Sequence, residues 1–253
     1  MRYIGGKKRQ SKIIANYIME HKGNRNVYVE PFCGMCSVAS RLTNEFDTII
    51  LADNNKHIVN LLKSLVDDTF VPYQWVSQEQ TEKEHKKFKA MKDKGIEHPM
   101  MAFWGHGMSF AAKWFGTLAR SKDASGVKSS KSHVRNSNRG LLELQEKLKQ
   151  IKNLTIVHSS YDELNIPNNS VVYCDPPYKG RNNMYGNVKQ FDHNDYWDWV
   201  RQLSTDDRLV IATEYTIPDD FEIIHNWGDT AILRKNNKFN TNEVLCKLKR
   251  ESV

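Results

Sequence analysis

The chain has 253 residues, a length that suits one α/β catalytic domain carrying a second, smaller module. Hydrophobic residues make up 39% of it, including 10 Phe and 10 Tyr, which excludes a chain that is disordered throughout. No apolar run approaches the roughly 20 residues that a membrane-spanning helix needs, and the N-terminus lacks the apolar core of a secretory signal. We therefore expect a cytoplasmic protein without a membrane partner.

Basic residues outnumber acidic ones, 37 Lys and Arg against 30 Asp and Glu, so the formal net charge is +7. This excess favours a polyanionic partner such as nucleic acid, although charge alone does not establish one. The four cysteines include one Cys-x-x-Cys pair, Cys33 and Cys36, a spacing found in zinc and redox sites. No second pair or histidine cluster follows at the spacing of a zinc finger, so we expect no metal site.

Apolar runs alternate with helical stretches in both halves of the chain, which predicts βα units around a mostly parallel sheet. The predicted strands are Asn26–Glu30, Thr48–Ala52, Leu154–His158, Val171–Cys174 and Leu209–Ala212, with a closing hairpin of Ala231–Leu233 and Val244–Leu248 around the polar residues 235–241. Three helical stretches are predicted. The first runs from the turn at Gly34 to about Asn44, and the second begins at Asp53 and has apolar positions at Ile58, Leu61, Leu62 and Leu65. The third covers Tyr196–Leu203, with Asn194 or Asp195 as its N-cap.

Residues 67 to about 140 break this alternation and predict an inserted module, which leaves 1–66 and 141–253 as the catalytic domain. A lysine-rich stretch, Glu79–Lys94, is expected to be helical, and an aromatic cluster follows at 103–115. Residues 121–138 are rich in Ser and basic residues and form either a solvated loop or an arm that contacts phosphates. The candidate phosphate-binding residues are Lys113, Arg120, Lys128, Lys131, Arg135 and Arg139.

The sequence Asp175-Pro176-Pro177-Tyr178 follows directly on the predicted strand at 171–174. A parallel strand delivers the next residue to the carboxyl edge of the sheet, and two prolines make the turn rigid. The Asp175 carboxylate and the Pro176 carbonyl can accept hydrogen bonds from the amino group of a nucleobase, which directs the nitrogen lone pair at an electrophile. Tyr178 can stack on a base that has left its duplex. The alternative is a structural Asp-Pro turn with a surface tyrosine.

A second candidate site is the loop that holds Phe32 and Gly34 after the first strand, with Asp53 at the end of the next strand. Such loops let backbone amides approach a nucleoside, and an acid at this distance can accept both ribose hydroxyls. The loop has too few glycines for a phosphate-binding fingerprint, which favours S-adenosylmethionine (AdoMet) over a dinucleotide. Gly34 as a plain turn and Asp53 as a helix cap are the alternatives.

The N-terminal sequence Arg2-Tyr3-Ile4-Gly5-Gly6-Lys7 is a third candidate for cofactor binding. Its paired glycines allow close backbone approach, and Tyr3 offers a stacking face. Lys7 can meet a carboxylate such as that of the AdoMet methionyl part. By itself the segment is equally typical of a basic, disordered terminus.

These motifs, in this order, resemble the DNA adenine-N6 methyltransferase family (Dam-like, D12 class, with small phage-type members). RYIGGK is similar to the family's N-terminal AdoMet motif, VEPFCGMC to its FxGxG motif, ADNN to its ribose-binding acid and VVYCDPPY to its catalytic motif. Residues 109–120, 191–200, 213–215 and 242–248 also resemble segments of phage-type members, whereas 67–100 and 121–140 match least.

The resemblance implies roles for single residues. Asp175, Pro176 and Tyr178 would hold the target adenine. The residues implied to contact AdoMet or to lie at its edge are Tyr3, Lys7, Phe32, Gly34, Asp53, Tyr161 and Asp175. Tyr161 lies where the family has an acidic-aromatic pair, but here the acid is displaced, because Asp162 follows the aromatic residue. Cys36 replaces the second glycine of FxGxG, and its side chain could crowd the cofactor.

We therefore expect a seven-stranded, mostly parallel, Rossmann-like methyltransferase sheet with an inserted target-recognition module at 67–140. The expected reaction is site-specific transfer of a methyl group from AdoMet to adenine N6 in double-stranded DNA by base flipping, in a bacterial or phage-infected cell, as in restriction-modification. No metal and no obligate protein partner is expected. The alternatives are an N4-cytosine or RNA amino-methyltransferase, a catalytically inactive nucleic-acid-binding protein on the same scaffold, or a small-molecule nucleotide-binding protein. Asp175 and the basic module favour methylation of adenine in DNA over these alternatives.

Overall fold

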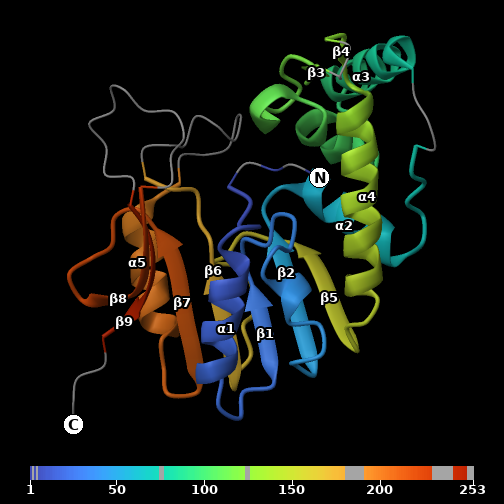
Figure 1. Ribbon diagram of the computed structural model, residues 1–253. Coiled ribbons are helices and arrows are strands. Elements are labelled where there is room, and N and C mark those ends of the chain that lie inside the picture. Colours follow the sequence, from blue (N-terminus) through green and yellow to red (C-terminus); the bar gives the residue numbers. More distant parts are fainter. Residues whose placement is uncertain are drawn as a thin grey trace.

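The centre of the molecule is a seven-stranded sheet with the strand order β5-β2-β1-β6-β7-β9-β8. The computed structural model describes residues 1, 3, 5–73, 77–122, 126–179, 191–229 and 242–249 (Figure 1). The strands of this sheet are β1 (Val27–Glu30), β2 (Thr48–Asp53), β5 (Asn153–His158), β6 (Ser170–Cys174), β7 (Arg208–Glu214), β8 (Phe221–Asp229) and β9 (Asn242–Leu248). The α-helices are α1 (Ser11–His21), α2 (Lys56–Val66), α3 (Gln78–Asp93), α4 (Lys131–Leu148) and α5 (His193–Leu203).

Six strands of the sheet run in one direction, and β9 runs in the opposite one. β1 pairs with β2 and β6, β2 with β5, and β6 with β7, all in parallel, whereas β9 runs antiparallel to both β7 and β8. The predicted seven-stranded, mostly parallel sheet is confirmed. Because the parallel strands end at one edge, the residues that end β2, β6 and β7 lie along the same carboxyl edge of the sheet. The first residues of β9 lie there too, since Val244 pairs with Glu214 at the end of β7.

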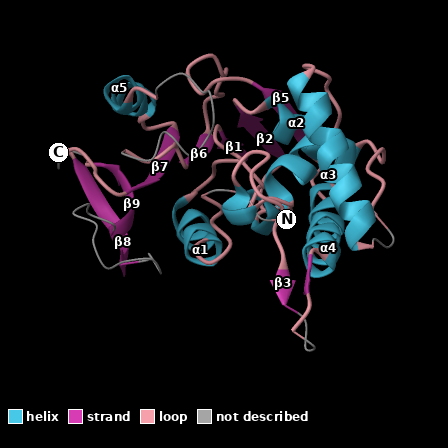
Figure 2. Ribbon diagram, turned by 90° about the horizontal axis from the view of Figure 1, so that it is seen from above, coloured by secondary structure: helices cyan, strands magenta, loops and turns pink. Residues whose placement is uncertain are grey.

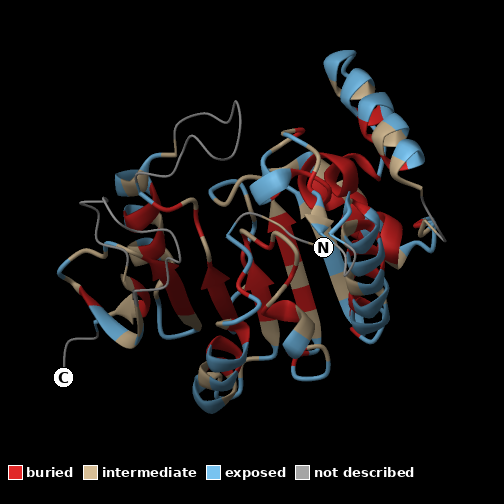
Figure 3. Ribbon diagram, turned by 45° about the horizontal axis from the view of Figure 1, so that its top comes forward, coloured by how far each residue is buried: buried red, intermediate tan, exposed pale blue. Residues whose placement is uncertain are grey.

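Helices cover both faces of the sheet. Successive side chains of a strand point to opposite faces, so Tyr28 belongs to one hydrophobic cluster and Val29 to the other. The Tyr28 cluster includes apolar residues of α1, α2 and α4, and the Val29 cluster those of α5. Figure 2 shows α1 and α5 on opposite sides of the sheet, and Figure 3 shows the buried residues concentrated in the strands between them. Among the described residues, no helix is long and apolar enough to span a membrane.

The segment between α2 and β5 lies beyond the carboxyl edge of the sheet, where Figure 1 shows α3, the strands β3 (Ser121–Lys122) and β4 (Lys128–Ser129) and one end of α4. The predicted lysine-rich helix at 79–94 is confirmed by α3. Short helical turns, η2 (Phe103–Gly107) and η3 (Phe110–Ala112), carry the aromatic cluster. Phe103 and Trp104 are fully buried and belong to the same hydrophobic cluster as Tyr28. Helix α4 continues across residue 140, the expected end of the inserted module.

Two helical expectations are corrected by the structure. Between the turn at Gly34 and Asn44 the chain forms only the short turn η1 (Ala39–Arg41). The reason is that Gly34 and Cys36 both have a positive φ, which an α-helix does not tolerate. The N-cap of α5 is Asp192, whose carboxylate accepts from the backbone amides of Asn194 and Asp195, the two residues expected to cap it.

Three further differences concern the segments that the sequence patterns left irregular. The described residues between 121 and 138 are not an irregular loop, because β3 and β4 pair as a short hairpin and α4 begins at Lys131. Contact of this segment with phosphates stays a prediction. The partner of β9 in the closing hairpin is β8, a strand that the patterns did not predict because its apolar residues are interrupted by polar ones. The expected strand Ala231–Leu233 lies outside the described residues. Helix α1 is also additional, and it buries Ile14, Ala15 and Ile18.

Candidate active site at the carboxyl edge of the sheet

The Asp175-Pro176-Pro177-Tyr178 turn leaves β6 at the carboxyl edge, as predicted, and meets a lysine from the N-terminal segment. The ammonium of Lys7 lies 2.6 Å from Asp175 Oδ1. Thr213, near the end of the adjacent strand β7, donates its hydroxyl to the same oxygen at 2.9 Å. Both contacts use Oδ1, and no hydrogen bond to Oδ2 comes from any residue that the structure describes. One oxygen of the carboxylate is therefore fixed and the other remains an acceptor.

A second carboxylate, that of Glu243 on β9, joins this group. Its Oε1 accepts from the Tyr178 hydroxyl at 2.7 Å and lies 3.3 Å from the Lys7 ammonium. Its Oε2 accepts from the Gln10 side-chain amide at 3.0 Å. The Lys7 ammonium also lies over the Tyr178 ring, 4.7 Å from its centroid, within the range of a cation–π interaction. The side chains of Lys7, Tyr178 and Glu243 thus hold one another in place.

Burial governs the protonation of this group. The side chains of Lys7 and Glu243 are 6% and 5% exposed, and that of Asp175 is 16% exposed. Burial raises the pKa of Asp175 above its ordinary value, and the adjacent Lys7 ammonium limits that rise. Burial alone would lower the pKa of Lys7, but Asp175 and Glu243 raise it above its ordinary value. Lys7 therefore stays charged between two carboxyl groups.

The chain that leaves the turn is anchored by Glu214, the last residue of β7. Its Oε1 accepts from the backbone amide of Lys179 at 3.0 Å, and its Oε2 accepts from the backbone amide of Tyr215. The Glu214 side chain is fully buried, which raises the pKa of its carboxyl group to about 7. Tyr215 in turn packs against Tyr178 with the two ring centroids 4.5 Å apart. The turn is therefore supported from β7 as well as from β9.

The predicted cofactor loop lies at the ends of β1 and β2, and β1 is the strand next to β6, which carries the Asp175 turn. Gly34 has a φ of +46°, and its backbone amide donates to Asp53 Oδ2 at 2.9 Å. Asp53 Oδ1 accepts from the Asn55 amide at 2.8 Å, while Asn55 itself is the N-cap of α2. A side chain at Gly34 would meet the ring of Tyr3 at 3.1 Å, so the loop requires glycine both for its conformation and for space.

The residues around this loop fit a nucleoside such as AdoMet. Asp53 is at the carboxyl edge, and each of its oxygens retains a lone pair after accepting one backbone amide, enough for ribose hydroxyls. Burial raises the pKa of Asp53 to about 6, so it is ionised above that pH. Phe32 and Tyr161 stack with centroids 5.4 Å apart and are both half-buried, which provides an apolar site beside the loop.

The two loop cysteines are accounted for by packing. Cys36 is fully buried in the hydrophobic cluster that contains Tyr28, with a φ of +53°, the conformation that favours glycine. Cys33 is 3% exposed in the same cluster. Both thiols are free, and within the described residues no group of three or more His, Cys, Asp or Glu side chains is placed to hold a metal ion.

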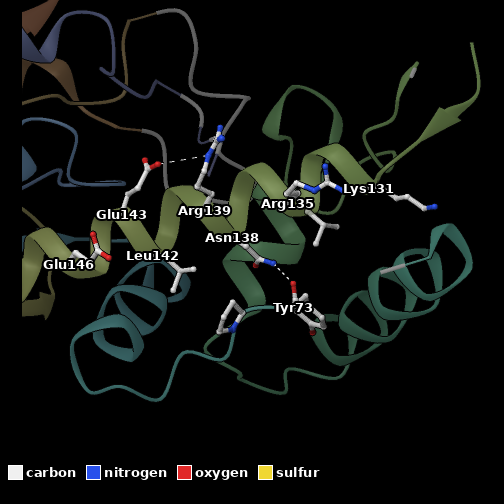
Figure 4. Close-up of a pocket in the computed structure, with 10 residues that line it drawn as sticks. Tyr73, Lys131, Arg135, Asn138, Arg139, Leu142, Glu143 and Glu146 are labelled. Atoms are coloured by element: carbon white, nitrogen blue, oxygen red, sulfur yellow. Dashed lines mark hydrogen bonds and ion pairs between the residues drawn. The ribbon is translucent and has the colours of Figure 1, made fainter. Parts of the chain in front are cut away.

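Basic residues of α4 line a groove in the inserted segment. Lys131, Arg135 and Arg139 follow one another at four-residue spacing, which places them on one side of the helix. With Tyr73 and Asn138 they border a groove of about 750 Å³ (Figure 4). Arg139 lies 3.8 Å from Glu143, whereas Lys131 and Arg135 form no ion pair with any described residue.

The structure brings the predicted residues together in three groups. Lys7, Asp175 and Tyr178 form one, Tyr3, Gly34 and Asp53 a second, and Phe32 and Tyr161 a third. Lys113, Arg120 and Lys128 are exposed and lie away from the α4 groove, and Arg120 is paired with Glu82. Arg2 and Ile4 of the N-terminal motif lie outside the described residues.

Three functional candidates were missed by the sequence analysis, namely Thr213, Glu214 and Glu243. Their signal was present, because each is a polar residue at the end of an apolar strand. Thr213 and Glu214 directly follow the predicted strand Leu209–Ala212 and could have been assigned to the carboxyl edge. Glu243 could not, because its position depends on the direction of β9.

Comparison with known proteins identifies the family of this chain. The profile of the family described as "D12 class N6 adenine-specific DNA methyltransferase" matches residues 3–198, which include the N-terminal motif, the Gly34 loop and the Asp175 turn. This chain belongs to that family. The description of the family is of DNA methyltransferases that act on adenine N6.

Two other searches add little. No curated protein matches the chain. Among solved structures, a crystal structure of the "putative methylase HI0767" from Haemophilus influenzae aligns with 95% of this chain and 98% of its own, with 12% sequence identity and a TM-score of 0.38. A likeness at that level supports no conclusion about the site.

Proposed function

We propose that this protein transfers a methyl group from AdoMet to the N6 amino group of an adenine flipped out of double-stranded DNA. The observation that carries the proposal is the arrangement at Asp175, where Lys7 and Thr213 fix Oδ1 and no described residue bonds to Oδ2. An amino nitrogen of adenine is a poor nucleophile because its lone pair is delocalised into the ring. Hydrogen bonds from that amino group to Asp175 Oδ2 and to the Pro176 carbonyl would direct the lone pair at the electrophile.

The charges of the site suit this reaction. With both carboxyl groups ionised, Asp175 and Glu243 contribute −2 and Lys7 contributes +1, so the group carries a net charge of −1. AdoMet, when bound, supplies a methyl group on a positively charged sulfonium. A negative, largely buried group beside the amino nitrogen stabilises the positive charge that the nitrogen gains during transfer. Positioning and electrostatics are then sufficient, and no strong general base is assigned.

Binding roles follow from the same groups of residues. Asp53 would accept the ribose hydroxyls of AdoMet, Gly34 would allow its close approach, and Phe32 and Tyr161 would pack on its adenine. Tyr178 would stack on the flipped base. Its ring is 8% exposed and contacts Lys7 and Tyr215, so stacking requires at least one of those contacts to change.

The inserted segment, residues 67–140, would recognise the DNA. Lys131, Arg135 and Arg139 form an exposed basic side of α4 next to the groove of Figure 4, suited to contact with the phosphate backbone. Lys113, Arg120 and Lys128 are further exposed cations of the segment that could contact phosphates outside that groove.

The test is incubation of the purified protein with radiolabelled AdoMet and unmethylated duplex DNA, followed by nucleoside analysis. We expect label in N6-methyladenine. We also expect Asp175→Ala to abolish transfer while duplex affinity changes by no more than a few-fold, because Asp175 is mostly enclosed and acts on the flipped base.

Other outcomes separate the remaining hypotheses. Label in N4-methylcytosine would keep the mechanism and overturn the choice of base. Label only with RNA would overturn the choice of nucleic acid. AdoMet binding without transfer to any of these substrates would indicate a catalytically inactive scaffold and would contradict the proposal.

A further inference from the structure

Glu243 is a buried carboxylate that the transfer mechanism above does not use. It lies at the second position of β9, is 4% exposed, and comes from the part of the chain that follows the matched region of the family profile. A buried carboxylate is costly unless its oxygens receive hydrogen bonds or ion pairs, so its partners indicate why it is there.

The partners of Glu243 come from two separate parts of the site. The Tyr178 hydroxyl donates to Oε1 at 2.7 Å, and the Lys7 ammonium lies 3.3 Å from the same oxygen. The Gln10 amide donates to Oε2 at 3.0 Å, at the entry to α1. One carboxylate thus connects the Asp175 turn to the N-terminal segment that carries Lys7.

The contacts of Glu243 have consequences for both Tyr178 and Lys7. Tyr178 is held at its hydroxyl by Glu243 and at its ring by packing against Tyr215. Lys7 would otherwise be held by Asp175 and the Gly5 carbonyl, and Glu243 draws it to a place over the Tyr178 ring and against Asp175 Oδ1. The orientation of Asp175, whose Oδ1 contacts Lys7, depends on where Lys7 lies.

We propose that Glu243 is a positioning residue of the methyl-transfer site, which fixes the Tyr178 ring through its hydroxyl and holds Lys7 against Asp175. The inference rests on the proposed function, because it assigns Glu243 to the same site. Glu243 touches neither the target base nor AdoMet in this account, and it acts only through Tyr178 and Lys7.

The kinetic test is a double-mutant cycle of wild type, Glu243→Ala, Tyr178→Phe and the combined variant, measured by single-turnover transfer to duplex DNA. We expect Glu243→Ala to lower the rate constant by about 10- to 100-fold, the effect of misplacing reacting groups by about 1 Å. AdoMet and duplex dissociation constants should change by less than about three-fold. In the Tyr178→Phe background, Glu243→Ala should lower the rate constant by a clearly smaller factor than in wild type, because the hydroxyl through which Glu243 acts is already gone.

Matched variants separate positioning from general stability. Glu222→Gln removes a carboxylate from the adjacent strand β8, where it pairs with Lys247 at the surface, and should retain the wild-type rate. Glu243→Gln keeps the size of the side chain and one acceptor oxygen, so it should fold and recover part of the rate lost in Glu243→Ala. A wild-type rate in Glu243→Ala, equal losses in both backgrounds of the cycle, or a loss of binding as large as the loss of rate would overturn the proposal.

A structural measurement tests the inference even if the proposed function fails. Crystal structures of wild type and Glu243→Ala should show the Tyr178 ring and the Lys7 ammonium displaced in the variant. If both remain in place, Glu243 does not position them and the inference is wrong. If the wild type forms no N6-methyladenine but the displacement occurs, the proposed function fails and the positioning role stands.

Discussion

At the residue scale, the most demanding position in the cofactor loop is Gly34. Its φ of +46° lies in the left-handed region, which costs other residues roughly 1 kcal/mol or more, and a side chain there would meet the Tyr3 ring at 3.1 Å. We expect Gly34→Ala to lower the free energy of unfolding by more than the conformational cost alone and to weaken AdoMet binding at least several-fold. Urea unfolding and calorimetric titration with AdoMet measure the two effects.

Gly95 provides a matched control for this substitution. Its φ of +68° carries the same kind of conformational cost, but no atom lies within 4 Å of where a side chain would begin. Gly95→Ala should therefore lose roughly 1 kcal/mol of stability and keep wild-type AdoMet affinity. Equal losses of stability and of AdoMet affinity in the two variants would show that contact with Tyr3 adds nothing to the effect at Gly34.

At the scale of elements, helix α4 carries the clearest DNA-binding prediction. Arg135 is exposed, lies between Lys131 and Arg139 on the same side of the helix, and forms no ion pair with a described residue. If it binds a phosphate, Arg135→Ala should weaken duplex binding several-fold. The slope of the logarithm of the duplex association constant against the logarithm of the salt concentration should also become shallower by about 0.9, the value for one phosphate contact.

The control for this prediction is on the same helix. Lys147 has the same charge and is exposed in the last turn of α4, outside the residues that border the groove. Lys147→Ala should leave both the affinity and the salt dependence unchanged, as measured by titration of labelled duplex between 50 and 200 mM salt, the range given for such slopes. An unchanged salt dependence in Arg135→Ala would assign the DNA contact to another surface.

At the scale of the whole molecule, several buried carboxyl groups make stability depend on pH. Burial raises the pKa of Glu30 from its ordinary 4.5 to about 8, that of Asp53 to about 6 and that of Glu214 to about 7. At pH values between its ordinary and its raised pKa, each of these carboxyl groups binds more protons in the folded state than in the unfolded state. The free energy of unfolding should therefore fall as pH rises from about 5 to 8.

Glu30→Gln tests the largest of these contributions. Glu30 is 3% exposed and accepts from the Tyr28 hydroxyl and the Ala39 amide. An amide does not titrate, so the free energy of unfolding of the variant should fall less steeply with pH than that of wild type. The two slopes should differ by at most about 1.4 kcal/mol per pH unit. Glu222→Gln, at an exposed carboxyl group, should follow the wild-type curve. Parallel curves for Glu30→Gln and wild type in urea unfolding would show that Glu30 is ionised when folded.

Local sequence patterns were enough to place the main strands of the sheet and the motifs at their ends. Short apolar runs placed β1, β2, β5, β6 and β7, and a parallel strand delivers the residue after it to the carboxyl edge. For this reason the Asp175 turn, Gly34 and Asp53 could be assigned to one edge from local patterns. The helix predicted after Gly34 failed because two residues with positive φ, one of them a cysteine, cannot be recognised from apolar spacing.

Which side chains meet across that edge depends on how the whole chain packs. Lys7, predicted to reach the cofactor, contacts Asp175 and Glu243, and the Tyr178–Glu243 hydrogen bond joins residues 65 positions apart. Glu243 reaches the edge because β9 runs antiparallel to β7, so that its first residues, not its last, lie beside the end of β7. Strand direction and long-range pairing arise from the packing of the whole chain, whereas periodicity records only local burial, and this is why the sequence predicted the motifs but not the residue that joins them.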